Sequence, residues 1–250
     1  MAAERSILFC FAHPDDESFT VAGTAARYLS EGVRCLLACA TRGEAGKMGD
    51  PPVCTREELP RVREQELREA CRIIGLPEPV LLGYRDRELA DAPGDEIRRK
   101  LVTLIRQHRP QIVITFDPEG ANRHPDHIAI SRFTTDAVAA AADPRFYPEA
   151  GPPHRVQRLL WTIPVSVWLD LRAGRDPYSC PGVDYVIDIR PWQARKADAL
   201  RAHRSQHLSI DRFFFHLSPE ERERALSIEA FRHGYGTPPP PGATDLFAGL

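Results

Sequence analysis

The chain has 250 residues, a length that fits one α/β domain or two small ones. Its composition, 42% hydrophobic and 27% charged, is that of a soluble globular protein and excludes a disordered or membrane-spanning chain. The 33 Lys and Arg residues nearly balance the 35 Asp and Glu residues, so no global field favours nucleic acid or anionic lipid, and we expect a small-molecule substrate.

The N-terminal segment and the cysteines predict a cytoplasmic protein. The apolar run at 7–12 is too short for the core of a signal peptide, and charges follow it at once. The rest of the sequence has no run close to the ~20 apolar residues of a membrane-spanning helix. The six cysteines form no C-x-x-C pair, and most lie in apolar runs where a thiol behaves as a small hydrophobic group. We therefore expect a soluble protein in a reducing compartment, without a membrane partner.

Short apolar runs alternate with segments of helical periodicity along the first 142 residues. Strands buried on both faces have sequences without polar alternation, and such strands are expected at 6–12, 33–40, 80–82, 112–116, 159–163 and 185–189. Amphipathic spacing predicts helices at 19–31, 60–74, 95–108 and 126–142. This alternation predicts right-handed βαβ units, and hence a single Rossmann-like three-layer α/β domain with a mostly parallel central sheet.

The periodicity weakens beyond residue 142. The Pro-rich segment 143–155 predicts a surface connection before the last strands. Further helices are expected to begin near Pro191 and after Ser218, because Pro suits the first turn of a helix and Ser its N-cap. We expect the domain to span residues 1–236 and to be followed by a Pro-rich, mobile C-terminal tail at 237–250, which has no periodicity.

Polar side chains follow two of the predicted buried strands. The strand at 6–12 leads directly into A-H-P-D-D-E at 12–17, and the strand at 112–116 leads to H-P-D-H at 124–127. Ligands of open α/β sheets bind beyond the carboxyl ends of the strands. If both strands are central, the two turns converge on one pocket.

The two turns together offer imidazole and carboxylate groups that suit a divalent metal. Catalytic zinc commonly takes three protein ligands and keeps a position for water, and two histidines with one carboxylate match that set. His13 and Asp16 can point to one place if Pro14 begins a helical turn. The remaining acids and histidine would serve proton transfer. The alternative is that the acids only cap helices and the histidines are solvated, an explanation that would have to apply twice.

The two motifs, in this order, resemble the signatures of the LmbE-like (PIG-L-like) zinc-dependent N-deacetylases. Four more segments look like family segments: T-R-G-E-A-G at 41–46, R-x-x-E-L at 63–67, L-G-Y-R-D at 82–86 and K-A-D-A-L-R-A-H-R-S-Q at 196–206. The resemblance extends from Ile7 to about Gln206. It implies an LmbE-like domain, a zinc cofactor and a small N-acetylated sugar conjugate as the binding partner.

The resemblance also implies roles for individual residues. Asp15 would be the general base that activates the attacking water. His124 would stabilise the tetrahedral intermediate, with Asp126 holding that imidazole oriented and cationic. Three residues would be the zinc ligands: His13, Asp16 and His127.

Two further residues are candidates for substrate binding. Arg63 lies on the apolar stripe of its helix, where a charge is unusual, and could pair internally with Glu66 or reach the substrate, as the resemblance implies. Asp86 follows an apolar strand end and resembles a family residue that contacts sugar hydroxyls, although an aspartate there is also a common turn former. The segment with His203 and Gln206 is expected near the pocket, without an assigned role.

The sequence thus predicts a metal-dependent hydrolase that removes the N-acetyl group from an N-acetylglucosamine-type sugar conjugate and releases acetate and a free amine. The alternatives are a non-haem iron(II) oxygenase with a 2-His-1-carboxylate site and a non-catalytic metal- or sugar-binding protein. The extra acid and histidine favour hydrolysis, and the βαβ pattern does not fit the barrels usual for such oxygenases. The sequence leaves open the aglycone of the substrate, the choice of zinc or iron(II), and the formation of a homo-oligomer.

Overall fold

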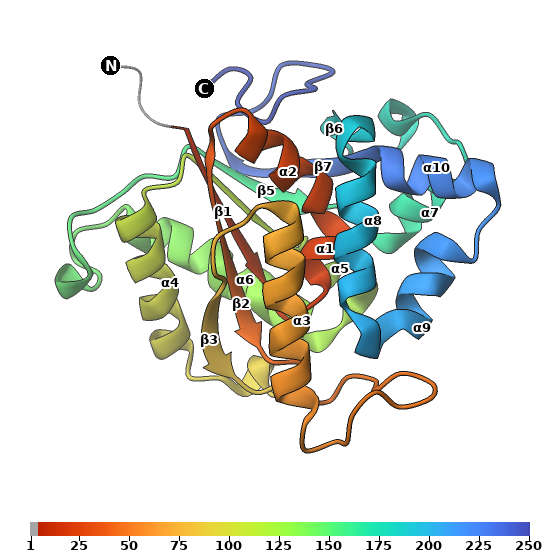
Figure 1. Ribbon diagram of the computed structural model, residues 1–250. Coiled ribbons are helices and arrows are strands. Elements are labelled where there is room, and N and C mark those ends of the chain that lie inside the picture. The colour runs from red at the N-terminus through yellow and green to blue at the C-terminus, as the bar shows by residue number, and fades with distance from the viewer. Residues whose placement is uncertain (1–4) are drawn as a thin grey trace.

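Seven strands form one sheet in the order β3-β2-β1-β4-β5-β7-β6 in the computed structural model, which describes residues 5–250 (Figure 1). The first five strands in chain order are parallel, whereas β7 runs antiparallel to β5 and β6. The strands are β1 Ser6–Phe11, β2 Arg34–Thr41, β3 Val80–Tyr84, β4 Ile112–Thr115, β5 Arg158–Thr162, β6 Tyr185–Asp188 and β7 Ile228–Gly236. Residues 1–4 of the predicted domain lie outside the described part.

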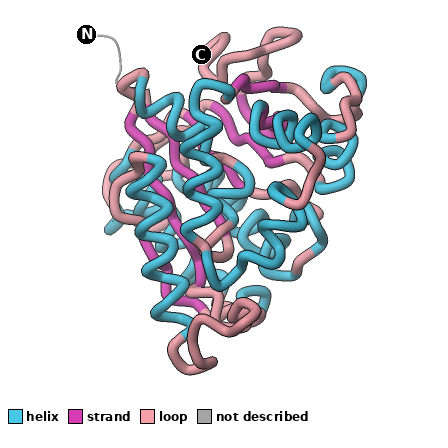
Figure 2. Tube along the Cα trace, turned by 45° about the vertical axis from the view of Figure 1, so that its right-hand side comes forward, coloured by secondary structure: helices cyan, strands magenta, loops and turns pink. Residues whose placement is uncertain are grey.

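Helices cover both faces of the sheet (Figures 1 and 2). Helices α2, α3 and α8 pack together on one face, and α4 and α6 pack together on the other. The helices are α1 Asp16–Thr20, α2 Ala22–Ser30, α3 Leu59–Ile74, α4 Gly94–His108, α5 Gly120–Arg123, α6 Pro125–Ala141, α7 Val165–Arg172, α8 Gln193–Ala202, α9 His207–Ile210 and α10 Pro219–Ser227. The predicted three-layer α/β architecture with a mostly parallel sheet is confirmed.

Strand β1 is central because its residues are apolar on both faces. All six residues of Ser6–Phe11 are buried, and the strand pairs with β2 on one side and β4 on the other. A strand covered on both faces loses no apolar side chain to water, which explains the lack of polar alternation in its sequence. The carboxyl ends of β1 and β4 therefore lie side by side at one edge of the sheet.

Three elements differ from the prediction. The helix expected at 19–31 is two helices, α1 and α2, because Val21 between them has a non-helical φ of −134°. Helix α7 was not predicted. Strand β7 was also missed, because His233, Tyr235 and two glycines occupy its second half and leave no continuous apolar run.

The C-terminal tail at 237–250 packs against the domain instead of extending freely from it. Leu246 is fully buried, and Phe247 is 9% exposed. The guanidinium of Arg158, in β5, donates to the carbonyl oxygens of Thr237 at 2.8 Å and Leu246 at 2.5 Å. The tail is therefore anchored at its two ends, and both its mobility and the domain boundary at residue 236 stay predictions.

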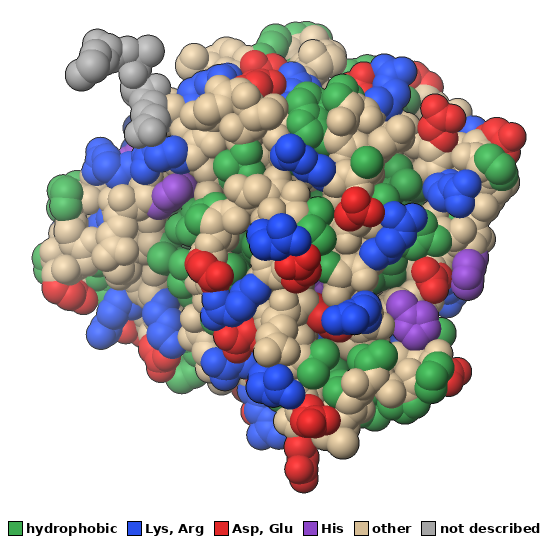
Figure 3. Space-filling view, in the orientation of Figure 1, with side chains coloured by type: hydrophobic (Ala, Val, Ile, Leu, Met, Phe, Trp, Pro, Cys, Tyr) green, Lys and Arg blue, Asp and Glu red, His purple; other side chains and the backbone are tan. Residues whose placement is uncertain are grey.

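The surface mixes charges of both signs. On the face shown in Figure 3, Lys and Arg side chains lie interspersed with Asp and Glu side chains. The cysteines are free thiols, and all but Cys54 are buried. Within residues 5–250, no helix combines the length and the apolar character needed to cross a membrane.

Candidate metal centre and active site

The site lies where the chain leaves β1 and β4. After β1 the chain turns sharply at Asp15, which has a φ of 112°, and the amide of Asp16 donates to the carbonyl of His13. After β4, His124 caps α6 and places His127 in the first turn of that helix. Because β1 and β4 are adjacent, the two turns meet, and Nδ1 of His13 lies 3.2 Å from Nε2 of His127.

Three side chains form a cluster with the spacing of metal ligands. Oδ2 of Asp16 lies 3.7 Å from Nδ1 of His13, and Oδ1 lies 3.3 Å from Nε2 of His127. Bonds of about 2.0–2.1 Å in tetrahedral geometry place zinc ligands roughly 3.3–3.4 Å apart. The cluster therefore fits a tetrahedral divalent ion. His124 offers a further nitrogen within 4.8 Å of those of His13 and His127.

The two ligand candidates beside His13 are held in place by the backbone. Oδ2 of Asp16 accepts from the amides of Ala12 at 3.1 Å and His13 at 2.8 Å. Burial alone would raise the pKa of Asp16, but the neighbouring His127 outweighs it and lowers the pKa to about 2. Nδ1 of His127 lies 3.2 Å from the carbonyl of Gly120, so it carries the proton and leaves Nε2 free to bind a cation.

Carboxylates surround His13 on its other edge. Its Nε2 lies 3.1 Å from Asp126 and 3.2 Å from Asp86. Burial lowers the pKa of His13, but the hydrogen bonds to Asp126 and Asp86 and the charge of Asp16 outweigh it and raise the pKa to about 10. This group of three acids favours a positive charge, which a divalent cation would supply more fully than a proton.

The role expected for Asp126 is not the one its geometry shows. Its carboxylate contacts His13 and the amides of Arg87 and Leu89, whereas only its backbone amide reaches His124, at Nδ1 and 3.2 Å. Burial, followed by the charges of His13 and His127, lowers the pKa of His124. The Asp126 carboxylate is therefore placed to orient His13, and a cationic His124 oriented by this carboxylate stays a prediction. Residues two apart at a helix start point in different directions, so the carboxylate faces away from the imidazole of His124.

Asp15 is held by Arg63 beside the ligand cluster. Nη2 of Arg63 lies 2.9 Å from Oδ2 of Asp15 and also donates to the carbonyl of Pro14, while Nη1 donates to the carbonyl of Gly43 at 2.9 Å. Burial raises the pKa of Asp15 to about 6, against the lowering effect of Arg63. The alternative pairing of Arg63 with Glu66 is not formed.

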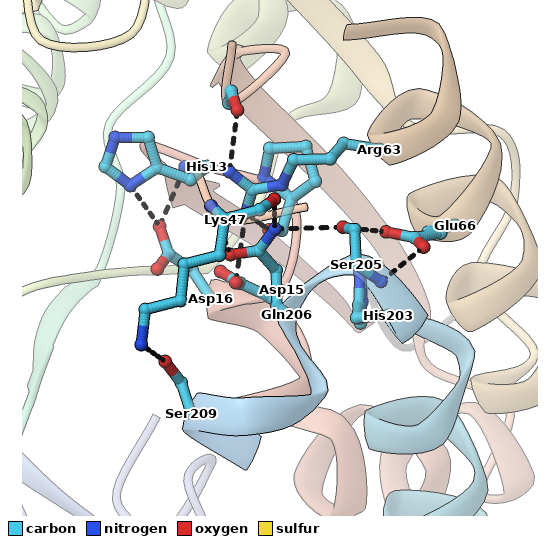
Figure 4. A network of polar contacts seen from close by, with 12 residues as sticks. His13, Asp15, Asp16, Lys47, Arg63, Glu66, His203, Ser205, Gln206 and Ser209 are labelled. Atoms are coloured by element: carbon cyan, nitrogen blue, oxygen red, sulfur yellow. Dashed lines mark hydrogen bonds and ion pairs between the residues drawn. The ribbon is translucent and has the colours of Figure 1, made fainter. Parts of the chain in front are cut away.

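Residues that the sequence did not assign support this arrangement from behind (Figure 4). Oε2 of Glu17 accepts from the backbone amide of Asp15 at 3.0 Å, and Oε1 lies 2.8 Å from Nε2 of the fully buried His203. Glu66 accepts from the amide and hydroxyl of Ser205 at 2.8 and 2.6 Å. The family resemblance of the segment at 196–206 predicted that it lies near the pocket. Its contacts with Glu17 and Glu66 could not be predicted from the sequence.

Gln206 connects the same segment to the loop after β2. Its side-chain Nε2 donates to the carbonyl of Lys47 at 2.7 Å, and its Oε1 accepts from the amide of Lys47 at 3.2 Å. Asp86 fixes the loop from the other side, because its Oδ2 accepts from the amide of Ala45 at 3.0 Å. The loop thus forms one wall of the site.

A cavity of about 400 Å³ opens over the cluster and brings most of the predicted residues together. This volume is within the usual range for small-molecule sites. Asp126 does not line it, since it is fully buried behind His13. The predicted residues that line it are His13, Asp15, Asp16, Arg63, Asp86, His124 and His127.

Comparison with known proteins identifies the family. Residues 8–138 match the family model described as PIG-L, GlcNAc-PI de-N-acetylase. The chain is 34% identical to 1D-myo-inositol 2-acetamido-2-deoxy-alpha-D-glucopyranoside deacetylase 2 of Saccharopolyspora erythraea, over 96% of this chain and 98% of that protein. The chain belongs to the PIG-L family. The predicted membership of the LmbE-like, PIG-L-like group is confirmed.

One further relative and one solved structure have other substrates in their names. A probable N-acetyl-alpha-D-glucosaminyl L-malate deacetylase 2 of Bacillus anthracis is 40% identical over 62% of this chain and 74% of that protein. The solved structure of N,N'-diacetylchitobiose deacetylase from Pyrococcus horikoshii, in complex with its inhibitor MPG, has a TM-score of 0.72 at 22% identity. That match covers 93% of this chain and 84% of the other, and it shows a shared fold.

Proposed function

We propose that this chain is a metal-dependent hydrolase that removes the N-acetyl group from an N-acetylglucosamine-type sugar conjugate and releases acetate and a free amine. The decisive observation is the cluster of His13, Asp16 and His127, with spacings of 3.2 to 3.7 Å, beside the partly buried Asp15. The PIG-L family and its named deacetylases give the reaction class. The partner of the site would be a small N-acetylated sugar conjugate.

Zinc is the metal that we propose, with iron(II) as the alternative. His13, Asp16 and His127 would hold it, because two imidazoles and a carboxylate suit a borderline cation of this kind. A zinc ion in such a site polarises a carbonyl and lowers the pKa of a bound water toward about 7. Proton transfer and stabilisation of the oxyanion would be carried out by side chains of the protein.

Asp15 is the proposed general base. Its carboxylate lies next to the ligand cluster, and Arg63 fixes one of its oxygens at 2.9 Å so that the other can accept a proton from the attacking water. Burial raises the pKa of Asp15 to about 6, which makes it a stronger proton acceptor than an ordinary aspartate while it stays ionised at neutral pH. The proton can then pass to the leaving amine.

His124 is proposed to stabilise the oxyanion as a neutral donor. Its Nδ1 accepts a hydrogen bond from the amide of Asp126, so the proton of the neutral ring is on Nε2. The half-buried ring lines the cavity, where this N–H can donate to the oxygen of the tetrahedral intermediate. Asp126 is retained as a catalytic-site residue, but it acts through His13.

Arg63 and Asp86 are the residues that we propose for sugar binding. Both line the cavity, and both are already fixed by contacts with its floor. An ionised carboxylate has about four lone pairs that can accept hydrogen bonds, so Asp86 can still accept from sugar hydroxyls.

The test is an amine-release assay on metal-loaded protein. The panel contains N-acetylglucosamine linked to inositol, to malate and to a second N-acetylglucosamine, and acetate and primary amine are both measured. We expect equal amounts of acetate and amine from at least one conjugate, with activity lost after chelation and restored by zinc. Absence of amine from the whole panel with metal bound would refute the proposal. Oxygen consumption with iron(II) and a 2-oxo acid would instead support the oxygenase alternative.

A further inference from the structure

A second cavity, of about 170 Å³, adjoins the metal cavity. Its walls come from α1, α7, β5, β7 and the π-helical turn Asp211–Phe215 that follows α9. We call it the apolar annex. Six residues line both cavities, so the two spaces share a wall: Phe19, Thr20, Ala121, Asn122, Val165 and Phe213.

Aromatic rings form much of the annex. The ring of Phe214 lies 5.3 Å from those of Phe19 and Trp168, and Phe213 lies 5.8 Å from Trp168 and 6.1 Å from Phe19. Such offset and edge-to-face contacts are favourable and hold the rings in place. The π-helical turn that carries Phe213 and Phe214 is a rare conformation that is frequent at functional sites.

The charged groups of the annex are fully paired. Nζ of Lys196 lies 2.6 Å from Oε1 of Glu229 and 3.0 Å from the carbonyl of Phe19. Glu229 also accepts from the amides of Gly23 at 3.0 Å and Thr24 at 2.7 Å. Because Lys196 and Glu229 already neutralise each other, a charged ligand would gain little from them. The remaining walls favour an apolar group.

One buried side-chain oxygen of the annex lacks a partner among the described residues. The hydroxyl of Thr162, which is 3% exposed, has no hydrogen-bond partner among the described residues. A single hydroxyl can bind one polar atom on an otherwise apolar group. It does not make the space suitable for a sugar or another polyol, which would need many partners.

We propose that the apolar annex binds an apolar group, about the size of a benzene ring, carried by the N-acylated sugar substrate of the neighbouring metal centre. The inference rests on the proposed function, and the substrate class follows from the shared wall. An apolar cavity of about 150 Å³ in another protein stays dry and binds benzene, which sets the scale for the annex. The apolar group would be either the aglycone or the N-acyl chain. The inositol and malate in the names of the relatives are polar.

Two series of substrates distinguish these sources. The first contains the methyl, hexyl and phenyl glycosides of N-acetylglucosamine, and the second contains methyl glucosaminides with N-acetyl, N-butanoyl and N-benzoyl groups. Binding is measured by calorimetry and turnover by amine release. We expect the larger apolar group to improve affinity and kcat/KM by at least about tenfold in one series, since each buried methylene has a substantial effect.

The variant Ala230→Leu tests the location. Ala230 is 6% exposed and lines the annex but not the metal cavity, so a larger side chain would fill the annex without touching the proposed catalytic groups. We expect the tenfold preference to disappear while the methyl N-acetyl substrate is hydrolysed as before. The control is Ala150→Leu, at a 9% exposed position that lines neither cavity. Ala230→Val gives a smaller filling and a partial loss if leucine impairs folding.

Three outcomes would overturn the proposal: equal affinity for all members of both series, a preference that survives both Ala230 variants in folded protein, or a preference lost equally in Ala150→Leu. Failure of the proposed function is recognised separately. In that case no substrate is hydrolysed, and calorimetry still reports whether the apolar members bind in a manner that depends on Ala230. Hydrolysis of the methyl substrate without any preference for an apolar group would support the proposed hydrolase function and contradict only the proposed role of the annex.

Discussion

The carboxylate of Asp126 lies 3.1 Å from Nε2 of His13, on the opposite edge of the ring from His127. The carboxylate therefore fixes the proton of His13 on Nε2 and leaves Nδ1 with a lone pair toward the ligand cluster. Ligating histidines commonly have such a partner, which orients the ring and raises its basicity. The amides of Arg87 and Leu89 hold the carboxylate in turn. Asp126 is thus placed to position His13, which we propose as a metal ligand.

We expect Asp126→Asn to weaken metal binding by about 10- to 100-fold, because an amide polarises the His13 ring less than a carboxylate does. Competition with a fluorescent zinc chelator measures the affinity. Asp136→Asn, an exposed change in the same helix, is the control and should leave the affinity unchanged. Normal metal affinity with reduced turnover would contradict our assignment and favour the original interpretation, in which Asp126 acts on His124.

Asp15→Asn should separate metal binding from turnover. The side chain keeps its size but no longer accepts a proton, so we expect turnover to fall by about 10²- to 10⁴-fold. Metal content should be retained, because the three proposed ligands are untouched, and elemental analysis of the purified variant measures it. His13→Ala is the comparison and should lose both metal and turnover. An Asp15→Asn variant with full activity would refute the general-base role.

The sequence brought the candidate ligands together because His13 and Asp16 directly follow the buried strand β1, and His127 follows the buried strand β4 after the short helix α5. Placing His13 after β1 and His127 after β4 needed only the rule that parallel strands end at the same edge. The role of Asp126 could not be predicted in the same way. It depends on the directions in which side chains point in the first turn of α6, and the sequence does not give these directions. His203 is distant in sequence from Glu17, and no periodicity links them. Strand β7 was missed because an antiparallel strand with two glycines lacks the apolar signal of β1.

Arg63→Lys should reduce turnover more than metal binding. The planar guanidinium bonds to three oxygens, those of Asp15, Pro14 and Gly43, and the single ammonium of lysine cannot reproduce this fork. We expect turnover to fall by about tenfold or more, in line with the loss of roughly 1.4 kcal/mol or more in the transition state. Steady-state kinetics with metal analysis measures both effects. Arg61→Lys, an exposed change on the same helix, is the matched control and should behave as the native protein.

The buried pair of Glu17 and His203 should behave as a coupled unit. His203→Leu leaves the Glu17 carboxylate buried with one charge partner fewer, and we expect a loss of about 3–5 kcal/mol in the free energy of unfolding. Adding Glu17→Gln should recover part of that loss, because the uncompensated charge is then removed. Urea denaturation of the two single variants and the double variant measures the coupling. Additive losses would show that the pair contributes nothing beyond its separate contacts.

Truncation after Gly236 should destabilise the domain. It removes the buried Leu246 and Phe247 and also the four carbonyl acceptors of Arg158, namely those of Thr237, Pro238, Leu246 and Ala248. Burial of a Leu or Phe side chain contributes about 1.5–3 kcal/mol, so the loss of both corresponds to roughly 3–6 kcal/mol and to a fall in Tm of about 6–24 °C for a domain of this size. Removal of the exposed Leu250 alone is the control. An unchanged Tm in the truncated chain would show that the tail contacts contribute no stability. Combining truncation with Arg158→Met then separates the two contributions, because an equal loss in both truncated variants identifies the apolar contacts of the tail as the main cause.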